Sequence, residues 1–259
     1  RIEKLLYRTI VLPNENVATR FLSSVYSRPH PHNFARQAVK SLCLKGNICV
    51  SIAAEIISLC RGTTNLALWI GPSDLDQKTN PLLVPLDELV LTSLSLSISL
   101  LFSHTPSFSL STLQVFRSLT HLEILNGWVL WSSTVGVEHL HGLTHLCLHI
   151  HTRRTKPGLV IPLLSHPCIR VLVFRISEGI NVVQAFLESN LLSNFRIVLV
   201  SQDFISHGDF GRGDISSLWT GAEKIVDWRR VSQGMSFITS TLVASSPHQQ
   251  EGLLVYQAP

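Results

Sequence analysis

A short apolar motif recurs along the chain and constrains its fold more than any other feature. Six copies have the LxxLxL shape or a relaxed form of it, and their anchor leucines are Leu42, Leu66, Leu94, Leu122, Leu146 and Leu172. Successive anchors are 24, 28, 28, 24 and 26 residues apart, which is the range of leucine-rich repeats. A weaker copy, FRIVLV, occupies residues 195–200, and YRTIVL at 7–12 has the pattern of a first strand. The sequence therefore predicts a stack of repeats that each contribute one strand.

The segments between these strands have helical length or helical spacing. They are residues 16–25, 51–60, 110–117, 160–165 and 182–192. Parallel neighbours need a connection of about a dozen residues, so strands that alternate with such segments favour parallel pairing. We therefore expect an α/β fold, an irregular leucine-rich-repeat-like solenoid with a parallel sheet on its concave side and helices and loops on its convex side.

The repeats and the segment that follows them are predicted to form one domain, residues 1–230. It would end in a capping helix at about 214–230, because a solenoid needs a cap over its last open face. The apolar residues of this helix fall on one face, which would pack over the last strand: Leu218, Ala222, Ile225 and Val226. Trp219 and Trp228 would shield the end of the sheet. Residues 231–259 are expected to be a terminal extension that is partly disordered.

Side chains alternate along a strand, so the residues beside the anchor leucines are expected to face the exposed, concave side. One row across the strands would be Ser41, Asn65, Ser93, His121, His145 and Val171, and the next Cys43, Ala67, Ser95, Glu123, Cys147 and Val173. A concave face of aromatic, His and acidic residues among small ones is typical of a solenoid that binds proteins. The candidate protein-binding residues are Asn65, Trp69, His121, Glu123, His145, His149 and Arg175.

The histidines of this face allow a second interpretation, a metal-dependent hydrolase on the same scaffold. His121 and His145 occupy equivalent positions in two LTHL motifs, so neighbouring strands would bring them to about 4.8 Å, with Glu123 and His149 nearby. However, structural zinc needs four ligands and catalytic zinc three oriented ones. Repetition of one motif on a half-buried strand explains the histidines more simply. We therefore predict neither a metal nor another cofactor.

Motifs that carry catalysis are missing from the sequence. It contains no GxSxG elbow and no GxxxxGK[ST] loop. Asp209, Phe210 and Gly211 spell a kinase magnesium motif, but neither the glycine-rich loop nor the HRD catalytic loop accompanies them. We therefore predict that the chain is not an enzyme.

Composition limits which cellular compartments and which classes of partner are expected. The net charge is only +4 and basic residues are scattered without interleaved aromatics, which argues against a nucleic-acid partner. Five cysteines without a CxxC pair favour reduced, mostly buried thiols. No signal peptide and no apolar run of 18 residues is present, so we expect a cytoplasmic or nuclear protein, not bound to membranes and monomeric.

The motifs together resemble a set of basidiomycete F-box-like and leucine-rich-repeat-like proteins. The resemblance is carried by LLYRTIVL (5–12), VKSLCL (39–44), LCRGTTNLALWI (59–70), FRSLTHLEIL (116–125), LTHLCL (143–148), FRIVLV (195–200) and GRGDISSLWTGAEKIVDWRR (211–230). In that set the repeats commonly follow an F-box, which docks onto a ubiquitin-ligase adaptor. No such segment precedes Tyr7, so the resemblance supports only the repeat portion of that architecture. The chain opens on Arg1 and not on Met, and whether it is a fragment of a longer protein stays open.

The resemblance implies an intracellular protein–protein interaction module, the substrate-recognition part of a ubiquitin-ligase receptor. If an F-box lies upstream, the ligase adaptor would be a second partner. Besides the metal-dependent hydrolase, one more alternative stays open: a lineage-specific scaffold with no specific role.

Overall fold

The computed structural model describes residues 2–71, 80–102, 109–125, 135–201, 216–232 and 241–242. The repeats predict one continuous stack. The internal contacts of the structure instead divide the chain into two compact units. The first unit is Arg1–Asn126 with His139–Gly142, and the second is Gly127–Glu138 with Leu143–Pro259. Each unit is an α/β arrangement of parallel strands and helices and is described by itself.

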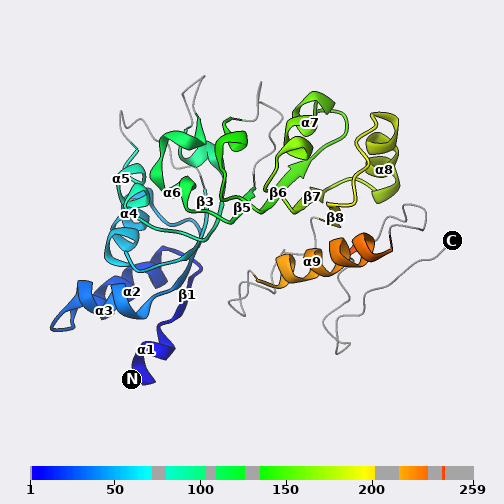
Figure 1. The fold of residues 1–259 in the computed structure, drawn as a ribbon. Coiled ribbons are helices and arrows are strands. Elements are labelled where there is room, and N and C mark those ends of the chain that lie inside the picture. Colours follow the sequence, from blue (N-terminus) through cyan, green and yellow to red (C-terminus); the bar gives the residue numbers. More distant parts are fainter. Residues whose placement is uncertain are drawn as a thin grey trace. The chain divides into compact units, whose positions relative to one another are not determined.

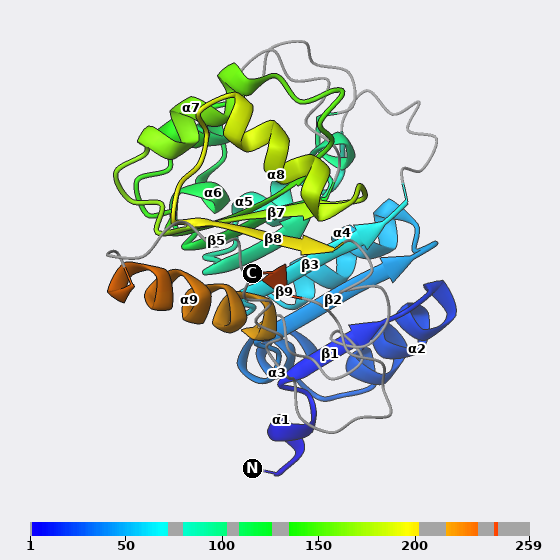
Figure 2. The same cartoon turned by 90° about the vertical axis from the view of Figure 1, so that its right-hand side faces the viewer.

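Five strands form the sheet of the first unit in chain order: β1 (Thr9–Leu12), β2 (Ser41–Gly46), β3 (Asn65–Ile70), β4 (Ser93–Leu96) and β5 (His121–Ile124). All four pairings among them are parallel, as predicted, and Figure 2 shows β1, β2 and β3 side by side. The helices are α1 (Ile2–Leu6), α2 (Glu15–Tyr26), α3 (Pro31–Ala38), α4 (Val50–Leu59), α5 (Leu83–Asp87) and α6 (Gln114–Arg117), with 3-10 turns η1 (Ile98–Leu100) and η2 (Leu110–Thr112). Figure 1 shows α2, α4 and α5 along one side of these strands.

The predicted register of the anchor leucines is confirmed within each unit. Leu42 pairs with Leu66, Leu66 with Leu94, and Leu94 with Leu122. In the second unit Leu146 pairs with Leu172, which pairs with Ile197 of the weaker copy. All of these side chains are buried. The anchors therefore form the core layer between the strands and the helices.

Threonines that precede the anchors join neighbouring repeats at the point where each strand begins. The hydroxyl of Thr64 donates to the carbonyl of Lys40 at 3.2 Å, that of Thr92 to Thr64 at 3.1 Å, and that of Thr120 to Thr92 at 3.0 Å. The same carbonyls also accept backbone N–H groups, for example two from Thr92 and Ser93 at Thr64. The recurring threonine of the motif therefore adds a side-chain hydrogen bond to a backbone carbonyl of the repeat before it.

The second unit contains the strands β6 (His145–Ile150), β7 (Val171–Ile176), β8 (Ile197–Ser201) and β9 (Thr241–Leu242), parallel and in chain order. Its helices are α7 (Pro157–Ser165), α8 (Ile180–Ser189) and α9 (Ser216–Val231), and the 3-10 turn η4 (Val137–His139) lies where the units change along the chain. Strand β9 belongs to the predicted terminal extension. Most of that extension, and the predicted start of the capping helix at 214, lie outside the described residues.

The C-terminal helix packs over the last repeat strand, β8, as predicted, and also over β7. Figures 1 and 2 show α7 and α8 on one side of β7 and β8 and α9 on the other. The predicted apolar face is confirmed, because Leu218, Ala222, Ile225 and Val226 are buried together with Trp219. Trp228, in contrast, is 39% exposed. Helix α9 therefore covers a strand face that the sequence predicts to be open.

Sequence reasoning misses three short helices of the first unit. Helices α1 and α3 flank β1 and α2, and α5 begins inside residues 71–85, whose polar and proline-rich composition predicts a loop. Pro31 occupies the first turn of α3, where the missing N–H costs nothing. These helices contain five to eight residues, too few for apolar periodicity to become visible.

Candidate functional site

The seven predicted binding residues divide between the two units. Asn65 and Trp69 lie on β3 and His121 and Glu123 on β5, all in the first unit. His145 and His149 lie on β6 and Arg175 on β7, in the second. Ser93 pairs with both Asn65 and His121, and Ser95 with both Ala67 and Glu123, so the predicted rows exist.

Three side chains of the first unit form a hydrogen-bonded chain across neighbouring strands. The indole Nε1 of Trp69 donates to the hydroxyl of Ser95 at 2.8 Å, and that hydroxyl donates to Oε2 of Glu123 at 2.6 Å. Ser95 was not among the predicted binding residues, although its place in the row beside Glu123 is the signal that could have identified it. We call Asn65, Trp69, Ser95, His121 and Glu123 the polar face of the first unit.

The expected exposure of the candidate residues is wrong for three of them. Glu123 is only 2% exposed, His145 6% and Arg175 7%, whereas Asn65, Trp69, His121 and His149 are partly exposed. Alternation assigns a side chain to a face of the sheet but does not reveal what covers that face. For His145 and Arg175, helix α9 lies on the same strands. These two residues are therefore interior residues of the second unit.

Helix α9 reaches His145 through one aromatic and one polar contact. The rings of His145 and Trp219 meet edge to face at 5.6 Å, and His145 Nε2 lies 3.1 Å from Oε1 of Glu223. Further along the helix, the guanidinium of Arg229 donates to the carbonyls of Phe195 and Ile197 at the start of β8. Burial lowers the pKa of Arg229 to about 10. The helix is thus anchored near both ends, by Trp219 packed against His145 and by the Arg229 guanidinium on two carbonyls at the start of β8.

His149 and Arg175 lie directly opposite each other near the carboxyl ends of β6 and β7. Burial, followed by the nearby charges of His151 and Arg175, lowers the pKa of His149. Just beyond the strands, Nδ1 of His151 lies 3.1 Å from Oε1 of Glu178, whose other oxygen accepts the backbone N–H of Thr152 at 2.9 Å. Glu178 thereby ties together the two segments that follow β6 and β7.

The metal-dependent alternative has no ligand cluster to support it in the described part of the chain. There, no three His, Cys, Asp or Glu side chains come together as metal ligands. His121 belongs to the first unit and His145 to the second, so each is placed only within its own unit. All five cysteines are free, and burial raises the pKa of the Cys43 and Cys60 thiols to about 12, which keeps both protonated.

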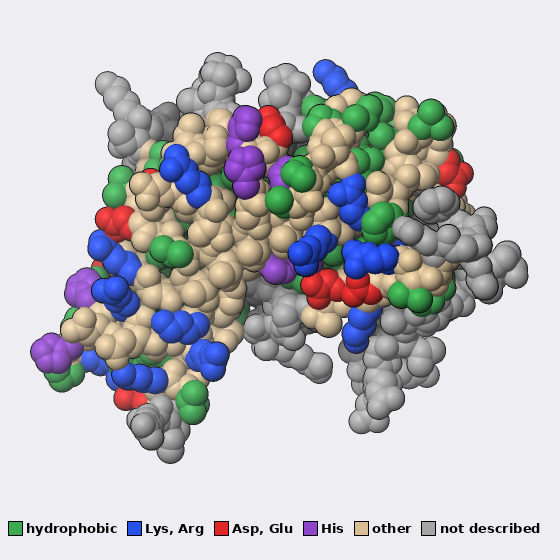
Figure 3. Space-filling model, viewed as in Figure 1, with side chains coloured by type: hydrophobic (Ala, Val, Ile, Leu, Met, Phe, Trp, Pro, Cys, Tyr) green, Lys and Arg blue, Asp and Glu red, His purple; other side chains and the backbone are tan. Residues whose placement is uncertain are grey.

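Figure 3 shows a second feature of the first unit, Lys and Arg side chains gathered over α2, α3 and β1. The exposed basic residues of this N-terminal part include Lys4, Arg8, Arg20 and Arg36. Arg28 is held differently, because it lies over the rings of Tyr7 and Phe34 and pairs with Glu3 at 2.6 Å. Such a positive surface raises the rate of encounter with acidic partners.

The hydrogen-bonded chain of the polar face predicts a measurable stability effect. Ser95→Ala removes a donor from the buried Glu123 carboxylate and an acceptor from Trp69, so we expect a loss of about 1–2 kcal/mol in the free energy of unfolding. Urea unfolding followed by tryptophan fluorescence measures it. The exposed Ser99 provides the control, because Ser99→Ala should change stability by less than about 0.5 kcal/mol. Equal effects of both substitutions would contradict the structural role of Ser95.

No helix among the described residues is both long and apolar enough to span a membrane. Comparisons of the chain with protein-family models, with curated proteins and with solved structures found no match in any of the three.

Proposed function

We propose that this chain is an intracellular protein-binding module built from leucine-rich-repeat-like units, and that the polar face of the first unit contacts the partner. The observation that carries the proposal is the chain of hydrogen bonds from Trp69 through Ser95 to Glu123. It fixes an indole ring that lies opposite Lys45 in the pairing of β2 with β3. A fixed aromatic side chain loses little conformational entropy on binding, which favours its use at an interface.

The neighbours of Trp69 supply the polar contacts that such an interface needs. Asn65 and His121 are partly exposed on either side of Ser93, and the Asn65 side-chain oxygen already accepts the hydroxyl of Thr92 at 3.2 Å. An aromatic anchor beside amide and imidazole groups is typical of the centre of a protein–protein interface.

In the second unit a strand face already binds a helix of the same chain, which suggests the type of partner. Its strand face holds helix α9 through buried apolar side chains, the Trp219–His145 ring contact and the Glu223–His145 pair. Amphipathic helices commonly bind protein surfaces in this way. We therefore propose that the partner presents an amphipathic helix to the polar face of the first unit.

The resemblance to F-box-like proteins extends the proposal to substrate recognition in a ubiquitin ligase. In that role the chain would hold a substrate protein while a separate segment recruits the ligase. If an F-box lies upstream in a longer reading frame, we expect ligase subunits to co-purify with that longer protein. They should not co-purify with this chain expressed alone.

Site-specific photo-crosslinking tests the proposed surface. A photoreactive phenylalanine placed at Asn65 should crosslink a discrete partner in cells, and Trp69→Ala should reduce that product at least about tenfold, as for a central aromatic anchor. The same group at Tyr26, exposed on α2, is the matched control and should not capture that partner. Capture of the same proteins from both positions, or a yield unchanged by Trp69→Ala, would exclude the polar face as the binding surface.

A further inference from the structure

The positive charge of the chain is concentrated in its first 60 residues. This segment contains eight Lys or Arg residues and three Glu residues, a net charge of +5. Residues 61–259 contain thirteen basic and fourteen acidic residues, a net charge of −1. Figure 3 shows part of the excess as Lys and Arg side chains over α2, α3 and β1. Charge that is segregated in this way indicates an anionic partner.

Four of these cations are neighbours at the point where β1 and β2 begin. The backbone N–H of Lys40 donates to the carbonyl of Arg8 at 2.9 Å, and the ammonium of Lys40 donates to the carbonyl of Arg36 at 3.2 Å. On the adjoining helix α1, the ammonium of Lys4 donates to Oε1 of Gln37, the residue that follows Arg36. We call Lys4, Arg8, Arg36 and Lys40 the basic cluster.

No carboxylate neutralises the basic cluster in the part of the chain that the structure describes. There, the guanidinium groups of Arg8 and Arg36 form neither a hydrogen bond nor an ion pair. The three acids of the first 60 residues have other partners: Arg28 for Glu3, the backbone N–H of Cys49 for Glu15, and the hydroxyl of Tyr26 for Glu55. The charge of the cluster is therefore left for a ligand to compensate.

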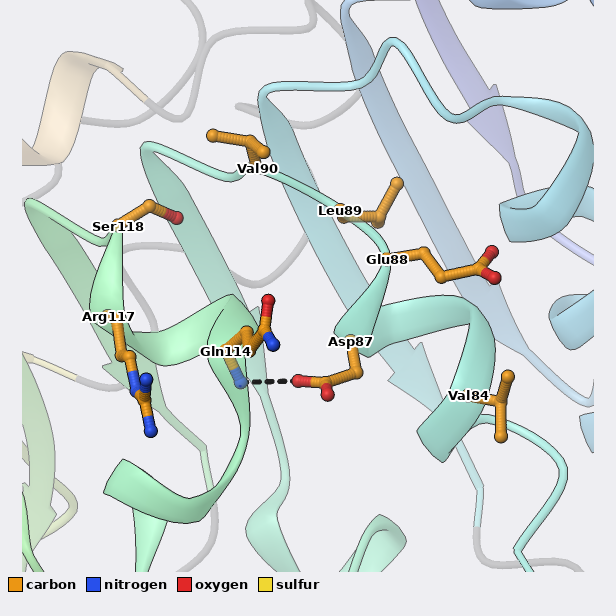
Figure 4. Close-up of a pocket in the computed structure, with 8 residues that line it drawn as sticks. All are labelled: Val84, Asp87, Glu88, Leu89, Val90, Gln114, Arg117 and Ser118. Carbon is orange, nitrogen blue, oxygen red and sulfur yellow. Dashed lines mark hydrogen bonds between the residues drawn. The ribbon is translucent and has the colours of Figure 1, made fainter.

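The next cation along the chain shows the opposite arrangement. The carbonyl of Gly62 accepts the ammonium of Lys40, so Arg61 adjoins the basic cluster, but Arg61 pairs with Glu88 at 2.8 Å. Figure 4 shows Glu88 next to Asp87, whose carboxylate accepts the backbone N–H of Gln114. The uncompensated positive charge of the N-terminal part therefore stops before Arg61.

Two exposed leucines lie beside the basic cluster. Leu5 is 65% exposed and Leu6 72%, and both follow Lys4 directly on α1. Helix α1 packs against α3, which carries Arg36. Adjacent exposed leucines form one apolar surface that a partner would remove from water. The partner should therefore combine negative charge with bulky apolar side chains.

Two other classes of anionic partner fit these surroundings less well. Single-stranded nucleic acids stack their bases on exposed aromatic rings. The rings nearest the cluster are those of Tyr7 and Phe34, and the guanidinium of Arg28 covers both, at 5.1 and 3.9 Å from their centroids. Membrane surfaces bind amphipathic helices with an extended apolar face, and α1 contains only five residues. An acidic peptide needs neither feature.

We propose that the basic cluster and the two leucines bind an acidic segment of a partner protein that also contains bulky apolar side chains. Carboxylates of that segment pair with the guanidinium groups of Arg8 and Arg36, which can each donate two parallel hydrogen bonds. Its apolar side chains cover Leu5 and Leu6. This surface shares no residue with the polar face on the strands, so a failure of either proposal leaves the other untouched.

Fluorescence polarisation with three labelled peptides tests the proposal on the purified chain. The first has the centre Glu-Glu-Leu-Leu-Glu-Glu in a Ser-Gly background, the second replaces each Glu by Gln, and the third replaces each Leu by Ser. We expect the first peptide to bind about tenfold more tightly than either of the others at low salt. Its advantage over the glutamine peptide should shrink as salt is added, because ions screen exposed charges.

Charge reversal in the basic cluster should weaken the first peptide. Arg8→Glu with Arg36→Glu should reduce its affinity at least about tenfold. Arg8→Gln with Arg36→Gln should reduce it less, and this pair places no acid in the last turn of α3, where an acid disfavours the helix. Arg153→Glu with Arg154→Glu, an equal change of net charge at exposed positions of the second unit, is the matched control.

The apolar part of the surface has its own variant, Leu5→Ser with Leu6→Ser, which should remove the preference for the first peptide over the serine peptide. A loss of affinity in the Arg8 and Arg36 variants, with affinity retained in the Arg153 and Arg154 variant, would support the proposal. Equal losses in both sets, or no binding of any peptide, would overturn it. Tighter binding of phosphatidylserine vesicles or of an oligothymidylate than of the first peptide would also overturn it, in favour of a lipid surface or a nucleic acid.

Discussion

Replacing Gly62 with alanine is expected to destabilise the first unit by about 3 kcal/mol, at the upper end of the cost of forcing extra atoms into a packed site. Gly62 follows helix α4 and lies against the C-terminal end of α3. A Cβ at this position would lie 1.7 Å from the carbonyl oxygen of Arg36 and 2.7 Å from its carbonyl carbon. Both atoms belong to the backbone, so the clash cannot be relieved by a side-chain rotation.

The surroundings of Gly62 leave little room for a compensating shift. The ammonium of Lys40 donates to the carbonyls of both Arg36 and Gly62, each at 3.2 Å. Separating the two segments to admit a methyl group would therefore disturb the lysine bridge and the start of β3, where Thr64 and Asn65 donate to the carbonyl of Lys40.

Gly71 provides the matched control for this experiment. It follows β3 directly, and a Cβ at Gly71 would find no heavy atom of the described residues within 4 Å. Gly71→Ala should therefore change the free energy of unfolding by no more than about 0.5 kcal/mol. Urea unfolding followed by circular dichroism measures both variants. If Gly62→Ala were as stable as Gly71→Ala, the close approach of α3 and residue 62 would be incorrect.

Gly62 also illustrates what the sequence could not predict. The glycine stands in the LCRGTTNLALWI segment, where a turn before a strand explains it adequately. Its actual constraint is a contact with Arg36, 26 positions earlier, and no local pattern contains that information. Strand positions, in contrast, could be predicted because their pattern is local. Alternation of Leu94 and Leu96 with serines is local, and the same LxL spacing recurs at Leu42, Leu66 and Leu146.

The candidate site also has one part that the sequence predicts and one part that it does not. The rows that place Ser95 beside Glu123 follow from the anchor leucines and are confirmed by the pairing of β4 with β5. Burial of the face was not predictable, because it depends on which distant segment packs there. The sequence indicates that α9 has an apolar face, and only the fold reveals that this face meets His145 instead of the end of the sheet.

Acidification is expected to destabilise the second unit through His145. Burial, assisted by the charge of Arg170, lowers the pKa of this imidazole from 6.5 to about 4. The Glu223 carboxylate favours the charged ring, but its side chain is 49% exposed and its field is screened by solvent, so burial dominates. The ring is therefore neutral at pH 7, and its Nε2 carries the proton because the carboxylate can only accept.

The sign of the pH effect follows from these two pKa values. Between pH 6.5 and about 4 the unfolded chain binds a proton at His145 that the folded chain does not bind, so stability falls as the pH falls through this window. By pH 5 the loss attributable to this residue is about 2 kcal/mol, and by pH 4 it approaches about 3 kcal/mol. Above pH 7 the contribution no longer changes.

Urea unfolding of the native chain and of His145→Gln at pH 7, 6 and 5 isolates this contribution. The variant should lose less stability than the native chain over that range, by about 2 kcal/mol. A shallow slope should remain, since burial also lowers the pKa of His149. His141→Gln, at an exposed position of the first unit, should keep the native slope. Parallel curves for the native chain and His145→Gln would mean that the imidazole is hydrated in solution, and α9 would then not cover His145.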